Sequence, residues 1–125
     1  MKTTFTQLAT EAEKVVAATQ RRLPAELKSK ARAVPVVFHD WPSEAILGDE
    51  FEPDILGMFV GDPHGITAGD ANPMPSQILL FLENIYDFAE GDLTVFRDEV
   101  RITYLHELGH YFGWDEDELE ARGLD

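Results

Sequence analysis

The sequence predicts an α+β domain in which a small sheet of about three strands packs against an N-terminal helix and a C-terminal helix. Apolar residues recur at helical spacing near both ends of the chain, and three short strand-like runs lie between them. The order is helix, strand, strand, long loop, strand, helix. With 125 residues, the chain is expected to form one domain over residues 1–125.

The composition narrows the classes of partner. The chain has 24 acidic and 10 basic residues and a formal charge of -14, which repels phosphate backbones and anionic membranes. We therefore expect no nucleic acid and no membrane as partner, while the oligomeric state stays open. The opening MKTTFTQLATEAEKVV lacks the apolar run of a secretory signal, which predicts a cytoplasmic protein. Because cysteine is absent, any metal must be held by His, Asp or Glu.

The first element is predicted to be an amphipathic helix. Its apolar stripe consists of Phe5, Leu8, Ala9, Ala12, Val15, Val16 and Thr19. Thr4 and Gln7, three residues apart, have the form of a capping box. Pro24 should end this helix or restart a shorter helical turn through Ala31, since proline fits a first helical position but not an interior one.

Three runs in the middle of the chain predict strands: Val34 to His39, Ile55 to Val60 and Gln77 to Leu82. The last run is almost continuously apolar, which is typical of a strand covered on both faces. The segment from Trp41 to Asp54 is rich in Pro, Gly and carboxylates and predicts a connection, with one helical turn around Ser43 to Leu47.

Two connections and one long helix complete the prediction. Gly61 to Ser76 is dense in Gly, Pro, Asp and Asn and predicts a long loop, either a rim over an active site or a plain excursion. Glu83 to Gly91 is predicted to be a short turn. A helix is expected from about Thr94 to Phe112, with a buried face formed by Phe96, Val100, Thr103, Tyr104 and Leu108.

The run HELGH within that last helix contains two histidines that are expected to bind a metal ion. Because His106 and His110 are four residues apart, a helix presents both imidazoles on one face to a single ion. Zinc in catalytic sites takes three protein ligands and one water, whose pKa falls to roughly 7. Glu107 points aside from the two histidines and is suited to act as general base on that water.

The third ligand is expected just after the helix. Gly113 can take the left-handed conformation that ends a helix, so the chain can turn back toward the ion. Six residues beyond His110 this turn reaches Glu116, which we predict to be the third ligand. Asp115 is an alternative ligand, as is Asp117.

Three aromatic residues lie close to the motif in sequence: Tyr104, Tyr111 and Trp114. They are candidates to line the site, where a tyrosine hydroxyl could stabilise an oxyanion. Core packing is the alternative role for each, and the one that we favour.

The segment DEVRITYLHELGHYFGWDEDEL, Asp98 to Leu119, resembles the small bacterial zincin-like metallopeptidases, also described as minimal zincins. The resemblance extends from about Val34 to Leu124. It implies a compact zincin core, a metal bound by His106, His110 and an acidic residue after the glycine, and Glu107 as the catalytic glutamate. The family pattern has aspartate at the position of Glu116, which keeps Asp115 open as the ligand.

These features together predict a zinc-dependent metallopeptidase with one zinc ion per chain and a peptide or protein substrate. An extended substrate could pair with an exposed sheet edge, for which the run from Ile55 to Val60 is the candidate. The alternative is a non-catalytic metal-binding or partner-binding domain on a zincin scaffold.

Overall fold

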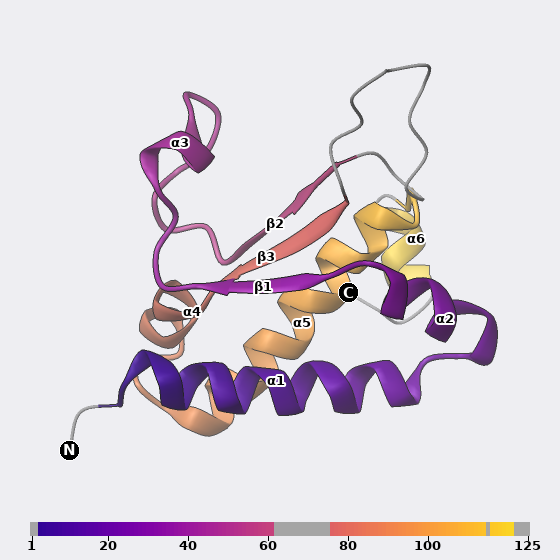
Figure 1. The fold of residues 1–125 in the computed structure, drawn as a ribbon, viewed down its shortest axis with the longest axis horizontal. Coiled ribbons are helices and arrows are strands. Elements are labelled where there is room, and N and C mark those ends of the chain that lie inside the picture. The colour runs from indigo at the N-terminus through magenta and orange to yellow at the C-terminus, as the bar shows by residue number, and fades with distance from the viewer. Residues whose placement is uncertain (1–2, 62–75, 115, 122–125) are drawn as a thin grey trace.

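A computed structural model describes residues 3–61, 76–114 and 116–121. The elements in chain order are α1 (Phe5–Arg22), α2 (Ala25–Ala33), β1 (Val36–His39), α3 (Glu44–Leu47), β2 (Gly57–Val60), β3 (Gln77–Phe81), α4 (Leu82–Phe88), α5 (Leu93–Tyr111) and α6 (Glu116–Ala121). Figure 1 shows the three-stranded sheet with the long helices α1 and α5 packed beside it. The predicted α+β class, with a small sheet and a helix toward each end of the chain, is confirmed.

The N-terminal helices follow the local sequence signals. The backbone N–H of Gln7 donates to Thr4 Oγ1 at 3.2 Å, and the backbone N–H of Thr4 donates to Gln7 Oε1 at 2.7 Å, which completes the predicted capping box. Pro24 lies between α1 and α2 and serves as the N-cap of α2, as the break at proline predicts. The buried face of α1 is formed by Leu8, Ala12, Val16 and Thr19.

The sheet has the strand order β1-β3-β2. β1 runs parallel to β3 with Val36 opposite Ile78, and β2 runs antiparallel to β3 with Gly57 opposite Leu80. The central strand is buried from Ile78 to Phe81, as predicted for a strand covered on both faces. Since β3 occupies the centre, β2 forms one edge of the sheet.

The structure corrects the turn predicted from Glu83 to Gly91. Most of that segment is helix α4, whose Leu82 and Ile85 are buried at helical spacing, as is Ala89 at its C-cap. The turn itself is confined to the end of this segment, where Glu90 and Gly91 have φ of 55° and 78°. Burial of this short apolar face in the tertiary structure stabilises a helix that would be marginal on its own.

The predicted loop from Gly61 to Ser76 falls on residues 62–75, which lie outside the described residues. Its two ends are adjacent, because a Cβ atom added to Gly61 would lie 2.7 Å from Ser76 Cα. Gly61 has a φ of 112°, a conformation that favours glycine. This end of the β2–β3 connection therefore depends on a residue without a side chain.

Helix α5 has one face in the main core. Every fourth residue of this face is buried to 1% exposure or less: Phe96, Val100, Tyr104 and Leu108. The helix contacts α1, α4, β2 and β3, so its rotation about its own axis is fixed by packing on several sides. In the described parts of the chain, no helix has the length and apolarity that crossing a membrane requires.

Candidate metal centre

The last turns of α5 bring His106, Glu107 and His110 together. One possible ligand atom from each of the three side chains lies within 4.8 Å of the other two. The two imidazole ring centroids are 4.9 Å apart. His106 and Glu107 are half-buried, while His110 is exposed. The four-residue spacing thus places both rings on one helix face, which is the arrangement that a shared ion needs.

This donor set suits a borderline metal such as zinc. Imidazole nitrogen and carboxylate oxygen both bind zinc, at about 2.0–2.2 Å. Donor atoms no more than 4.8 Å apart are close enough for one ion and its water to lie among them. His106 and His110 fit as ligands, and Glu107 is adjacent to both.

The chain turns immediately after these histidines. Gly113 has a φ of 79°, its N–H donates to His110 O at 3.0 Å, and the N–H of Trp114 donates to Gly109 O at 2.9 Å. These two bonds form a Schellman motif, which requires a residue that tolerates the left-handed conformation. The predicted glycine turn is therefore present, and α6 begins three residues later (Figure 1).

The predicted third ligand starts helix α6. Glu116 is the first residue of α6, but its side chain lies outside the described residues, as does all of Asp115. Asp117 is exposed on α6. The choice of Glu116 over Asp115 or Asp117 thus stays a prediction.

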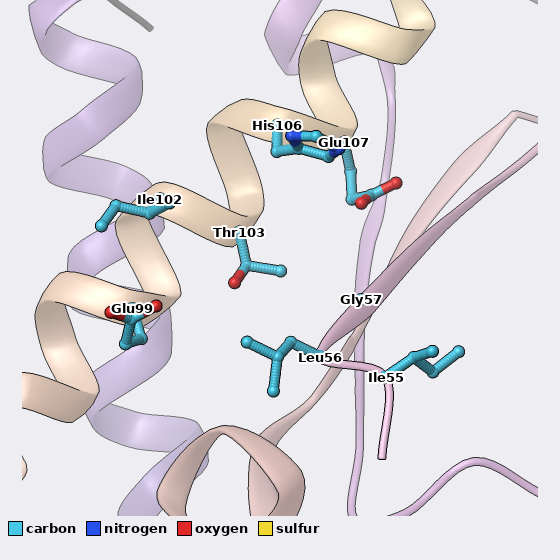
Figure 2. A pocket seen from close by; sticks show the side chains of 8 residues that line it. All are labelled: Ile55, Leu56, Gly57, Glu99, Ile102, Thr103, His106 and Glu107. Carbon is cyan, nitrogen blue, oxygen red and sulfur yellow. The ribbon is translucent and has the colours of Figure 1, made fainter. Parts of the chain in front are cut away.

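A cleft runs along α5 on both sides of Glu107. One cavity of about 310 Å³ is lined by Ile55, Leu56, Gly57, Glu99, Ile102, Thr103, His106 and Glu107 (Figure 2). A second cavity of about 320 Å³ is lined by Phe51, Ile55, Gly57, Met58, Phe59, Glu107 and His110. The two cavities share Ile55, Gly57 and Glu107, so they lie next to each other with Glu107 in the lining of both, and together we call them the cleft.

Gly57 sets how closely the two walls of this cleft approach. A Cβ atom added to Gly57 would lie 2.7 Å from Thr103 Cγ2 and 3.1 Å from the backbone oxygen of Leu79. The first distance is shorter than any normal contact, so only glycine lets β2 pack this close to α5. This contact accounts for the glycine at the start of β2.

Asn84 of α4 holds the wall opposite α5. Its side-chain amide donates to the backbone oxygens of Pro53 and Ile55, at 2.7 and 2.9 Å. The backbone N–H of Phe81 donates to Leu56 O at 2.9 Å. The segment before β2, which has no regular structure of its own, is thereby fixed beside His106 and Glu107 of the HELGH run.

The outer edge of β2 borders the same cleft. Among the described residues β2 pairs with β3 alone, so the backbone groups on its other edge have no strand partner there. Met58 and Phe59 of this strand line the second cavity. Glu107 lines the same cavity.

The three aromatic residues that were candidates to line the site pack against other parts of the fold. Tyr104 is fully buried and its hydroxyl accepts a hydrogen bond from Gln20 Nε2 at 3.0 Å, so the structure places it in the core beside α1 instead of in the site. Burial raises the pKa of Tyr104. Tyr111 packs against Phe59, and Trp114 packs against Phe112. None of the three is among the described residues that line the two cavities.

Sequence reasoning missed several residues of the cleft. Glu99 and Thr103 precede His106 by seven and three residues, so they share its helix face, and helical spacing alone could have identified them. Asn84 and Gly57 carried no such signal, because their contacts depend on which distant segments the fold brings together.

Comparison with known proteins agrees with this geometry. A family model described as zincin-like metallopeptidase matches residues 31–124, a range that includes the whole sheet, α5 and the HELGH run. No curated protein matches the chain. Because the match covers most of the sequence, the chain belongs to the zincin-like metallopeptidase family.

Proposed function

We propose that this protein is a zinc-dependent metallopeptidase that hydrolyses peptide bonds in the cleft beside α5. The observation that carries the proposal is the grouping of His106, Glu107 and His110 in the lining of that cleft. A structural role for the two histidines would not require an open cavity on either side of the glutamate. Membership of the zincin-like metallopeptidase family supports the same reading.

His106 and His110 would bind one zinc ion per chain through imidazole nitrogens. We propose Glu116 as the third protein ligand, with Asp115 as the alternative, since both follow the turn at Gly113. Bound zinc supplies Lewis acidity, which lowers the pKa of water to roughly 7 and polarises a carbonyl oxygen.

Glu107 is proposed as the general base. Its carboxylate would take a proton from the attacking water and then deliver that proton to the leaving amine. Both cavities border this side chain, so a peptide that occupied both would cross in front of it. This position supports Glu107 as the proton acceptor next to the scissile bond of such a peptide.

The substrate is proposed to be an extended peptide that adds to the outer edge of β2. Backbone hydrogen bonds at this edge would supply affinity that does not depend on sequence, and the cavities would receive side chains. Gly57 favours this arrangement, because the close approach of β2 to α5 keeps the edge next to Glu107.

The test combines zinc content with peptide cleavage. The zinc-loaded protein and its Glu107→Gln variant are incubated with a proteome-derived peptide pool, and products are identified by mass spectrometry. We expect cleavage by the wild type and a loss of at least about a thousandfold in Glu107→Gln, with zinc retained, since removing an essential base removes its whole contribution. Asp98→Asn, an exposed change on the same helix, should keep full activity.

One result would favour the alternative function. Stoichiometric zinc in the wild type with no cleavage of any peptide would indicate a non-catalytic metal-binding or partner-binding domain on the same scaffold. Equal cleavage by wild type and Glu107→Gln would instead contradict the role of Glu107.

A further inference from the structure

We infer that Glu99 makes the His106 side of the cleft a subsite for a basic side chain, lysine or arginine, of the bound peptide. The inference rests on the proposed function and names the class of substrate that the cleft selects. It concerns the first cavity, which Glu99 and His106 both line. We call this cavity the Glu99 subsite.

The position of Glu99 fits a side-chain subsite. It precedes His106 by seven residues, which corresponds to two helical turns and about 10 Å along α5. Figure 2 shows Glu99 and Glu107 at different levels of the helix, with Thr103 between them. A long side chain that starts near the scissile bond would therefore be needed to reach the Glu99 carboxylate.

The lining of the subsite matches the two parts of a lysine or arginine side chain. Ile55, Leu56 and Ile102 supply aliphatic surface to the cavity that Glu99 and His106 line. Lysine and arginine bury their methylene stems along such surface and keep the charged head at a polar group. Beyond His106 and Glu107, Glu99 is the one charged side chain among the described residues that line this cavity.

The Glu99 carboxylate is available to a ligand. It is half-buried, and within the described ranges it forms no ion pair with a lysine or arginine of the chain. Arg97 and Arg101 are each two residues away, a spacing that does not place side chains on the same helix face. Arg97 pairs instead with Glu11 of α1 at 2.9 Å. A half-buried carboxylate without a basic partner is stabilised by an incoming cation.

The other half of the cleft has a different character. The second cavity is lined by Phe51, Met58 and Phe59 beside Glu107 and His110, with no further carboxylate among its described residues. It suits a neutral apolar side chain. Selection for positive charge is therefore expected at one subsite only, and not as a general consequence of the formal charge of -14.

The experiment uses a fixed panel of alanine-based decapeptides, each with a single Lys, Arg, Met or Glu at a scanned position. Cleavage by the zinc-loaded wild type, Glu99→Gln, Glu99→Lys and Asp98→Asn is measured as kcat/KM. We expect the wild type to favour Lys or Arg over Met by about tenfold at one position, the size of a hydrogen bond to a charged group. Glu99→Gln should abolish this preference, and Glu99→Lys should favour Glu instead.

Asp98→Asn is the matched control. It removes the same charge one residue away, at an exposed position that does not line the cavity, and should keep the tenfold preference. An equal loss of preference in Asp98→Asn and Glu99→Gln would overturn the inference, because it would show a general effect of net charge. Cleavage without any basic preference would overturn it and leave the proposed function intact.

Binding separates the two proposals if no peptide is cleaved. The same panel is titrated by calorimetry into Glu107→Gln and into the Glu107→Gln, Glu99→Gln double variant, both loaded with zinc. Tighter binding of Lys or Arg peptides that disappears in the double variant would uphold the subsite while the peptidase proposal fails. Equal binding of the Lys and Met peptides by Glu107→Gln would overturn the subsite.

Discussion

The two faces of helix α5 differ in what they contact and therefore in what they contribute. One face is almost completely buried: Phe96, Val100, Tyr104 and Leu108. The other lines the cleft with polar groups: Glu99, Thr103, His106, Glu107 and His110. The buried face fixes the position of the helix against α1, α4 and the sheet, and the cleft face gains its geometry from that fixation.

Within α5, the residues that stabilise the fold are therefore largely separate from the residues that line the cleft. A change on the buried face removes packed apolar surface, while a change on the cleft face removes groups that water already reaches. Thr103 is the point where the two functions meet, because it lines the cleft but is buried under Gly57 of β2. Substitutions at neighbouring positions should therefore have effects of different kinds.

The largest expected effect on stability comes from Leu108→Ala. Leu108 is 1% exposed, so its truncation leaves a cavity and should lower the free energy of unfolding by about 2–5 kcal/mol. Glu107→Gln, one residue earlier but on the cleft face, should change it by less than about 1 kcal/mol. Urea unfolding followed by circular dichroism measures both values. Similar losses in the two variants would contradict the separation of faces.

Gly57→Ala should act at the contact between the two walls. The new methyl group would overlap Thr103 Cγ2, which should lower the free energy of unfolding by about 1–3 kcal/mol and widen the cleft. Thr103→Ser removes that Cγ2 atom and keeps the hydroxyl, so Gly57→Ala should lower the free energy of unfolding by less in the Thr103→Ser background. A double-mutant cycle on the unfolding free energies of the wild type, the two single variants and the double variant measures this difference. Strictly additive losses would show that this contact does not set the approach of β2 to α5.

Asn84→Ala should loosen the wall that faces α5. The backbone oxygens of Pro53 and Ile55 would each lose a hydrogen-bond donor, which should lower the free energy of unfolding by about 1–2 kcal/mol. Because Ile55 borders both cavities, we also expect KM for peptides to rise more than kcat falls. Steady-state kinetics on one cleaved peptide measures this split. An unchanged KM in a destabilised variant would limit Asn84 to a role in stability.

The smallest effect is expected at high pH and comes from Tyr104. Burial raises the pKa of its phenol, so the unfolded chain ionises first, near pH 10, and the folded state loses stability as the pH rises further. Tyr104→Phe removes the hydrogen bond with Gln20, which should lower the free energy of unfolding by about 1 kcal/mol at neutral pH. Because phenylalanine does not ionise, the variant should also lose less stability than the wild type as the pH rises above about 10. Urea unfolding between about pH 8 and 11 tests the prediction. If the free energy of unfolding fell equally with pH in the wild type and in Tyr104→Phe, ionisation of Tyr104 would not contribute to the loss of stability.

Local signals predicted much of the fold. Thr4 with Gln7 marked the start of α1, Pro24 marked the break before α2, and Gly113 marked the turn after α5, because each acts through hydrogen bonds or backbone angles near its own position. The grouping of His106 with His110 is local in the same sense, since a helix alone brings the two rings together.

What sequence reasoning missed depends on contacts between distant segments. α4 forms because Leu82 and Ile85 are buried against elements that the local composition does not reveal. The cleft has a second wall only because β3 lies between β1 and β2, which places Gly57 against Thr103. Glu99 is intermediate, because its helix face was predictable while the cavity that it borders was not.

Zinc binding by variants of single histidines tests whether His106 and His110 together hold one metal ion. After equilibrium dialysis against buffered zinc, metal per chain is measured by mass spectrometry for wild type, His106→Ala, His110→Ala and His39→Ala. We expect one zinc ion in the wild type and in His39→Ala, and at least about a hundredfold weaker binding when either His106 or His110 is replaced. Undiminished zinc in His106→Ala and His110→Ala, or an equal loss in His39→Ala, would contradict it.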